Sequence, residues 1–293
     1  MTEIKQIEEK ENGICFFEMK NDNIRVITTN LGCHILSIFT KDRAGQEADI
    51  LLGFENVEDC KKDGSYMGAL VGRVANRIAD AKFQLNGETY ELAANNGKNH
   101  LHGGLHGWNQ KLFQYEQLED GIRFCYVSPD MEEGYPGSVF LKVSYRLKEE
   151  GLEMEYEAVS DQDTIINITN HPYFNLSGGQ DKIYHHQLRM KADQIACVDE
   201  NCCANGEFLD VAGTPFDFRD FHEIGERIYE DHEQIKRAGG CNGKHGKPYE
   251  NRDGVALEAQ FLPNSIHIEK EPRVILRKGE QYHAVTSYRF EVE

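Results

Sequence analysis

The sequence lacks several features that mark whole classes of protein. It has no apolar run long enough to span a membrane, and residues 1–11 contain no apolar signal core. It has no Walker loop, no G-x-G-x-x-G after a predicted strand and no G-x-S-x-G nucleophile elbow. We therefore expect no membrane insertion and no secretory signal, and we find no motif for a nucleotide cofactor or a serine hydrolase.

Basic residues are scarce relative to acidic ones. The 293 residues include 32 lysines and arginines against 50 aspartates and glutamates, which gives a formal net charge of −18. Such a charge repels polyanions, so we expect neither nucleic acid nor an anionic membrane as a partner. A small neutral ligand such as a sugar is compatible with this charge. The sequence leaves open whether the protein is a monomer or a homodimer.

The cysteines follow no disulfide or metal-binding pattern. No C-x-x-C spacing occurs, and in a chain of this length without a signal sequence scattered cysteines indicate free thiols in a cytoplasmic protein. The eight cysteines are Cys15, Cys33, Cys60, Cys125, Cys197, Cys202, Cys203 and Cys241.

Alternation of apolar and polar side chains dominates the chain. Residues 139–147 and 152–158 predict a β-hairpin with one apolar and one charged face, with Phe140 as the exception on the outer face. Residues 81–85 and 88–92 predict a second hairpin around Asn86-Gly87, a pair that suits a turn with two positive φ angles. Further strands are expected at residues 14–19, 24–29, 33–40, 187–190, 255–260 and 282–291.

Helical signal is sparse. The best candidate spans residues 221–237, where Ile224, Ile228 and Ile235 have roughly helical spacing, although Gly225 weakens it. Many short strands and few short helices predict an all-β, mainly antiparallel fold built as a large β-sandwich. Because no linker or internal repeat interrupts the chain, we expect a single domain over residues 1–293.

Two segments carry candidate acid and base groups. His171 lies between a β-branched run and Gly178-Gly179, flanked by amides and aromatic residues; it is either a catalytic histidine or a structural one in a strand-end turn. Glu258 lies in the apolar run 255–264. It is either a buried general base, with a pKa raised by desolvation, or a glutamate on the wet face of an edge strand.

Two further clusters could hold a ligand. Arg73 and Arg77, beside Asn76, offer planar, multi-donor hydrogen bonds to a polyhydroxyl ligand, or form a surface pair. A glycine-rich stretch then carries three histidines and the only tryptophan, which could stack on a sugar face. The histidines suggest either a zinc site or a loop opened for a ligand. These residues are His100, His102, His106 and Trp108.

Taken in order, these clusters resemble the galactose mutarotase (aldose 1-epimerase) family. Three matching phrases carry most of the resemblance: GRVANRI at 72–78, LHGG at 101–104 and TNHPYFNL at 169–176. Four supporting phrases are EGYPG at 133–137, GTPFDF at 213–218, LEAQ at 257–260 and YRF at 288–290. The phrases are collinear and extend over nearly the whole chain.

The resemblance implies a galactose mutarotase-like β-sandwich that interconverts the α and β anomers of an aldohexose without a cofactor or metal. It implies that His171 is the general acid at the ring oxygen and that Glu258 is the general base at the C1 hydroxyl. Asn76, Arg77 and His102 match substrate-binding positions. The expected partner is a small-molecule sugar such as galactose or glucose.

The chain departs from the family pattern in one region. An aspartate-bearing G-x-D-H-N-F phrase and a later Q-x-Y-T-x-N phrase of the family have no match in this sequence. At residues 236–247 the chain runs directly from the glycines that begin the first phrase to the residues that follow the second. We expect an internal deletion near residues 240–242 that leaves an exposed sheet edge or a gap in the core.

Three alternatives remain open from sequence. The first is a catalytically weakened or inactive sugar-binding relative. The second is a zinc enzyme built on His100, His102 and His106. The third is a mutarotase for another sugar, including a phosphorylated hexose.

Overall fold

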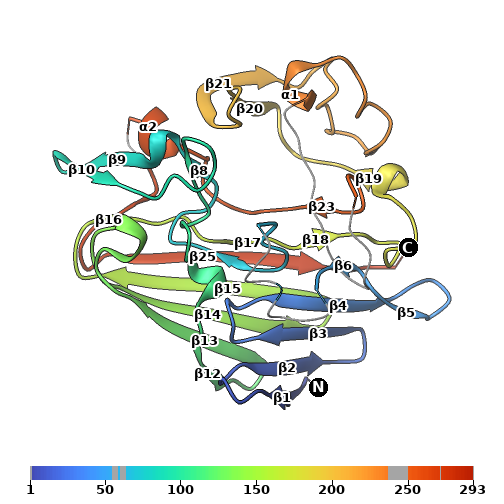
Figure 1. Cartoon of the computed structure of the whole chain (residues 1–293). Coiled ribbons are helices and arrows are strands. Elements are labelled where there is room, and N and C mark those ends of the chain that lie inside the picture. The colour runs from blue at the N-terminus through green and yellow to red at the C-terminus, as the bar shows by residue number, and fades with distance from the viewer. Residues whose placement is uncertain (1, 55–58, 60–63, 237–249, 271, 293) are drawn as a thin grey trace.

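The computed structural model describes residues 2–54, 59, 64–236, 250–270 and 272–292. Two five-stranded antiparallel sheets dominate it, and in Figure 1 the N-terminal sheet lies in front of the other. The N-terminal sheet joins, in chain order, β1 (Glu3–Glu9), β2 (Cys15–Lys20), β3 (Ile24–Thr29), β4 (Ile35–Lys41) and β5 (Glu47–Asp49). The second sheet joins β12 (Gln114–Gln117), β13 (Gly121–Ser128), β14 (Val139–Lys148), β15 (Gly151–Ser160) and β25 (Gln281–Arg289).

The main core lies between these two sheets. Phe17 of β2 packs on Tyr115 of β12 and Phe124 of β13, with ring centroids 4.6 and 6.1 Å apart. The same cluster of buried side chains includes Phe174 and, from β25, Tyr282. The alternating pattern that predicted a sandwich therefore places one face of each sheet in a shared apolar interior.

Short strands cross above the second sheet in Figure 1, among them β17, β18 and β23. β18 pairs with both β6 and β23, and β17 pairs with β7. The short strands are β6 (Leu51–Leu52), β7 (Leu70–Val71), β8 (Arg77–Ile78), β9 (Lys82–Leu85), β10 (Glu88–Glu91), β11 (His100–Leu101), β16 (Thr164–Ile165), β17 (Thr169–Asn170), β18 (Tyr173–Phe174), β19 (Gln187–Leu188), β20 (Gln194–Val198), β21 (Ala204–Asp210), β22 (His222–Glu223), β23 (Val255–Ala256) and β24 (Ile275–Leu276).

Both predicted hairpins are confirmed. β14 and β15 pair along their full lengths, and the pairing of Lys148 with Gly151 leaves a two-residue turn. β9 and β10 pair around Asn86 and Gly87, whose φ angles are +53° and +85°. Phe140 is 53% exposed, so it is on the outer face as expected.

The described helices are short. The two α-helices are α1 (Glu233–Lys236) and α2 (Ser265–Ile268), and the 3₁₀ turns are η2 (Ala79–Ala81), η3 (Trp108–Gln110), η4 (Glu132–Gly134) and η5 (Ile183–His185). In the described ranges, none of the helices has the length and apolar character needed to cross a membrane.

The predicted helix at 221–237 is wrong for its described part. Only Glu233–Lys236 is helical, and β22 pairs with β19 instead of joining a helix. Gly225 packs so closely on Tyr184 that an added Cβ would lie 2.8 Å from the Tyr184 Cβ. These tertiary contacts override a weak helical period.

Six cysteines lie in the described ranges, and none of the six forms a disulfide. Cys15, Cys33 and Cys203 are buried, whereas Cys125, Cys197 and Cys202 are partly exposed. The prediction of free thiols is therefore confirmed for these six. Cys60 and Cys241 lie outside the described residues.

Candidate functional site

The segment carrying His171 is held from the core side by Asn170. The Asn170 side chain accepts a hydrogen bond from Tyr156 Oη and donates one to Tyr145 Oη, each at 2.7 Å. The backbone of His171 bonds to residues 68–69. Because neighbouring side chains in an extended segment point to opposite faces, an Asn170 anchored in the core turns His171 away from it.

The segment after β23 runs antiparallel to the segment that carries His171. Ala256 pairs with Tyr173, and five residues later the Phe261 N–H donates to Asn167 Oδ1 at 2.9 Å. This register places the only carboxylate of residues 257–262 opposite His171.

That carboxylate, Glu258, contacts His171 directly. Glu258 Oε1 lies 3.3 Å from His171 Nε2, and the two side chains are only 16% and 8% exposed. Of the two interpretations open from sequence, the structure supports a buried glutamate and excludes one on a wet face. Glu258 Oε2 and His171 Nδ1 are buried without a hydrogen-bond partner.

Burial shifts both groups toward their neutral forms. Desolvation lowers the pKa of His171 to about 4 and raises the pKa of Glu258 to about 7. Mutual attraction of the charged forms would shift both values the other way, so loss of water dominates. Between these pKa values the pair holds one proton, and burial favours the neutral form with that proton on Glu258.

His102 completes the cluster as a hydrogen-bond donor. Its ring centroid lies 5.2 Å from that of His171 and 4.6 Å from that of Tyr66. Burial and the neighbouring cationic groups keep the pKa of His102 well below its usual value, so the ring is neutral. His102 Nδ1 accepts the Asn76 N–H at 3.1 Å, which leaves the proton on Nε2.

Glu133 fixes the loop that carries His102. Its carboxylate accepts the N–H groups of Leu105 at 2.8 Å and His106 at 3.1 Å. An added Cβ on Gly104 would lie 2.1 Å from Glu133 Oε2, and Gly104 has φ +103°. Only glycine permits this turn beside the carboxylate.

Asn76 and Arg77 lie beside His102. Asn76 has φ +66°, and its Oδ1 accepts the Arg77 N–H at 2.8 Å. Arg77 Nε donates to Asn96 Oδ1 at 2.9 Å, and the Arg77 side chain remains partly exposed. The structure thus brings together all five expected site residues: His171, Glu258, His102, Asn76 and Arg77.

Arg73 serves the fold, so both roles considered for it from sequence are wrong. It is 2% exposed, and its guanidinium donates to the carbonyls of Pro136 at 2.9 Å and Gly137 at 3.0 Å. It also donates to Ser128 Oγ at 2.6 Å, and burial lowers its pKa to about 10. A guanidinium engaged in this way ties its segment to the turn at 135–137.

The three-histidine zinc hypothesis is also wrong. The ring nitrogens of His100 lie 2.8 Å from the Ala93 carbonyl oxygen and 2.7 Å from Tyr135 Oη, and His106 is exposed. In the part of the chain that the structure describes, the one group with three possible metal-ligating atoms is His102, His171 and Glu258, with these atoms within 4.8 Å of one another. Because His102 Nε2 carries a proton, it has no lone pair for a metal, and the arrangement favours a hydrogen-bonded ligand.

Trp108 does not stack on a ligand. It is 1% exposed, and an added Cβ on Gly72 would lie 2.1 Å from its ring. The expectation of sugar stacking is therefore wrong. Trp108 fills the main core instead.

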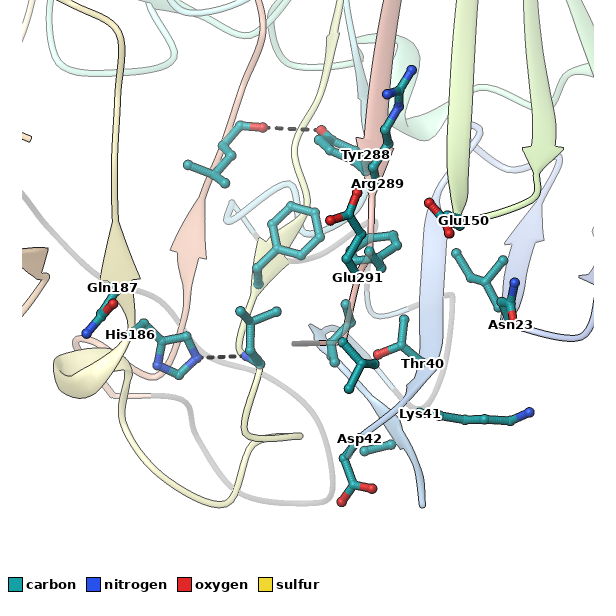
Figure 2. A pocket seen from close by; sticks show the side chains of 18 of the residues that line it. Asn23, Thr40, Lys41, Asp42, Glu150, His186, Gln187, Tyr288, Arg289 and Glu291 are labelled. Atoms are coloured by element: carbon teal, nitrogen blue, oxygen red, sulfur yellow. Dashed lines mark hydrogen bonds between the residues drawn. The ribbon is translucent and has the colours of Figure 1, made fainter. Parts of the chain in front are cut away.

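A separate groove of about 1330 Å³ lies on the other face of the β18–β23 segment. Phe174 and Leu257 line it, whereas their neighbours Tyr173 and Glu258 contact His171. Figure 2 shows the groove between one wall with His186 and Gln187 and another with Thr40, Lys41, Tyr288 and Arg289. The groove lies beside β23, the end strand of its three-stranded sheet.

Sequence reasoning missed several supporting residues. Asn170 and Tyr173 lie within the TNHPYFNL phrase and Glu133 within EGYPG, so the phrases contained them without revealing their roles. Tyr66, whose ring centroid lies 4.6 Å from that of His102, has no local signal. Its contact depends on tertiary packing alone.

Comparison with known proteins gives a consistent result. The family model described as aldose 1-epimerase matches residues 16–238. A galactose mutarotase from Sus scrofa is 37% identical over 320 aligned positions that cover 94% of each chain. A galactose 1-epimerase structure from Lactobacillus acidophilus has a TM-score of 0.83 and 26% identity, covering 99% of this chain and 98% of the other. An aldose epimerase homologue from C. elegans shares the fold, with a TM-score of 0.84 and 24% identity over 99% of this chain and 100% of that one.

The comparison also bears on the expected deletion. An alignment of 320 positions is longer than this 293-residue chain, so the Sus scrofa protein carries residues without a counterpart here. The family match ends at residue 238. The predicted break near residues 240–242 lies outside the described residues.

Proposed function

Because the chain belongs to the aldose 1-epimerase family, we propose that it interconverts the α and β anomers of an aldohexose by opening and closing the sugar ring. The observation that carries this proposal is the buried contact between His171 and Glu258. An imidazole and a carboxyl group that share one proton supply the acid and the base that ring opening needs. Galactose and glucose are the proposed substrates.

In the proposed mechanism Glu258 takes the proton of the C1 hydroxyl while His171 gives a proton to the ring oxygen. Rotation about C1–C2 then exposes the other face of the aldehyde, and closure reverses the two transfers. Because burial favours the shared proton on Glu258, that proton crosses the 3.3 Å contact to His171 Nε2 before the ring opens. The sugar then replaces the direct contact between the two groups.

Three further residues hold the sugar. His102 donates from Nε2 to a hydroxyl, since its Nδ1 is engaged by the Asn76 N–H. Arg77, partly exposed and steadied by Asn96, donates to other hydroxyls. Asn76 contributes through its backbone N–H, which fixes the His102 tautomer.

Polarimetry tests the proposal. Purified protein added to fresh α-D-galactose or α-D-glucose should speed the change in optical rotation above the rate in buffer. A rate equal to that in buffer for both sugars would contradict it. Sugar-induced thermal stabilisation without any added rate would favour a sugar-binding relative that has lost catalysis, which the missing residues make the second candidate.

We further propose a cytoplasmic protein that works as a monomer or a homodimer. The six described free thiols, none in a disulfide, support a reducing compartment. Sedimentation of the purified protein would distinguish the two assembly states.

A further inference from the structure

Gln260 has a buried side-chain oxygen without a partner, two residues after Glu258. Gln260 Oε1 is buried and accepts no hydrogen bond, like Glu258 Oε2 and His171 Nδ1. A buried acceptor without a donor is unfavourable, and native structures hold few of them unless a ligand completes the bond. These three unpaired atoms lie on the segment that carries His171 and on the neighbouring segment that carries Glu258 and Gln260. Their number points to a polar ligand.

The register of the chain puts Gln260 on the same face as Glu258. Ala256 is opposite Tyr173 and Phe261 is bonded to Asn167, so the intervening residues are extended. In an extended segment alternate side chains share a face.

Leu257 and Phe261, on either side of this pair, are consistent with this alternation. Leu257 lines the groove on the core side, and Phe261 packs against the main core. Glu258 projects the other way and contacts His171. The next side chain of that set is Gln260.

We propose that Gln260 is a further substrate-binding residue, whose amide oxygen accepts a hydrogen bond from a ring hydroxyl other than the reacting one. This inference rests on the proposed function. Two residues of extended chain span roughly 6.6 Å. Gln260 therefore contacts a different part of the sugar from the C1 atoms on which Glu258 and His171 act. The ligand class is a pyranose with a free hydroxyl on carbon 2, 3 or 4.

Steady-state mutarotation of Gln260→Leu and Gln260→Ala tests this role. Loss of one hydrogen bond made equally in the ground and transition states should raise KM roughly tenfold and leave kcat within about twofold. Gln187→Leu, which changes the groove on the other face, is the matched control and should leave both constants unchanged. An unchanged KM in both Gln260 variants would overturn the inference.

Deoxy sugars identify the partner hydroxyl. With 2-deoxy-, 3-deoxy- and 4-deoxyglucose, the wild type should show a raised KM for one analogue, and Gln260→Leu should raise KM no further for that same analogue. If Gln260→Leu raised KM by the same factor for every analogue, Gln260 would affect the shape of the pocket and not one hydroxyl, and the inference would be overturned.

A stability measurement separates this role from a structural one and from failure of the proposed function. Because Gln260→Leu removes a buried acceptor without a partner, the variant without sugar should melt at a higher temperature than the wild type. Galactose should raise its melting temperature less than it raises that of the wild type. A lower sugar-free melting temperature would show that Gln260 supports the fold and would overturn the inference. An inactive wild type would overturn the proposed function, and the thermal shift would still decide whether Gln260 contacts sugar.

Discussion

Desolvation sets the protonation of His171 and Glu258, and this is the decisive physical effect at the level of single residues. The two pKa values, about 4 for the imidazole and about 7 for the carboxyl, bracket a range in which the pair holds one proton.

The pH dependence of kcat/KM should therefore be bell-shaped. Below about pH 4 both groups are protonated and no base remains; above about pH 7 both are deprotonated and no acid remains. Polarimetric rates between pH 3.5 and 9, each corrected for the spontaneous rate, measure this profile. A flat profile from pH 5 to 9 would be incompatible with these assignments.

Glu258 should also lower stability at high pH. Its pKa is about 7 when folded and 4.5 in the ordinary state, so above pH 4.5 the unfolded chain loses this proton first, and stability falls until pH 7. The full cost above pH 7 is on the order of 3 kcal/mol. Glu258→Gln cannot ionise, so urea denaturation should show it more stable than wild type at pH 8 by about that amount, with little difference at pH 4.5.

Glu149→Gln is the control for this measurement, because Glu149 lies in the exposed turn between β14 and β15. It should match the wild type at both pH values. If Glu258→Gln proved no more stable than wild type at pH 8, the raised carboxyl pKa would be refuted.

At the scale of elements, Arg73 and Arg77 are four residues apart but have different roles. Arg73 is buried among backbone carbonyls, whereas Arg77 is half-buried beside the site. The sequence could place both in one phrase, but their difference arises from the turn at 135–137, which is distant in the chain.

Arg73→Met should destabilise the fold by roughly 3 kcal/mol or more, because several buried acceptors lose a charged donor. Arg77→Met is the matched comparison: it should change the melting temperature little and raise KM. Thermal unfolding and steady-state kinetics on both variants measure this split. The reverse pattern would show that the two roles are exchanged.

The elements also show where sequence reasoning succeeds and fails. Alternation and the Asn86-Gly87 pair predicted the hairpins because register and turn chemistry are local. The helix at 221–237 failed because contacts of Gly225 with Tyr184 replaced helical ones. The predicted sugar-stacking role of Trp108 was wrong because its ring packs on the Gly72 backbone, a tertiary contact that the sequence does not indicate.

At the scale of the whole molecule, the two large sheets share one core, although β1–β5 and β25 come from opposite ends of the chain. Phe17 and Tyr282 belong to the same buried cluster. We therefore propose a single folding unit over residues 1–293.

Calorimetry should show one unfolding transition whose calorimetric and van 't Hoff enthalpies agree. Two separated transitions, or a calorimetric enthalpy well above the van 't Hoff value, would divide the chain into independent units. A truncation that removes β25 should abolish the transition, since β15 would lose one of its two partner strands and the core would open.

At this scale, the contact between His171 and Glu258 is also separate from the groove that Phe174 and Leu257 line. The groove of about 1330 Å³ is on the core side of β18 and β23, while His171 and Glu258 are on the other side. The collinear phrases located the pair from sequence, because each phrase supplies one side chain to it. They could not locate the groove, whose walls come from both ends of the chain.

The central claim is that His171 and Glu258 carry out mutarotation, and the most direct test is polarimetry of His171→Asn and Glu258→Gln on α-D-galactose at pH 6. The wild type should exceed the buffer rate, each variant should lose roughly 10²- to 10⁴-fold in kcat, and His106→Asn, an exposed histidine outside the pair, should remain active. Because Glu258→Gln is expected to be at least as stable as wild type, its loss of activity cannot be attributed to unfolding. Full activity in either His171→Asn or Glu258→Gln would contradict the account.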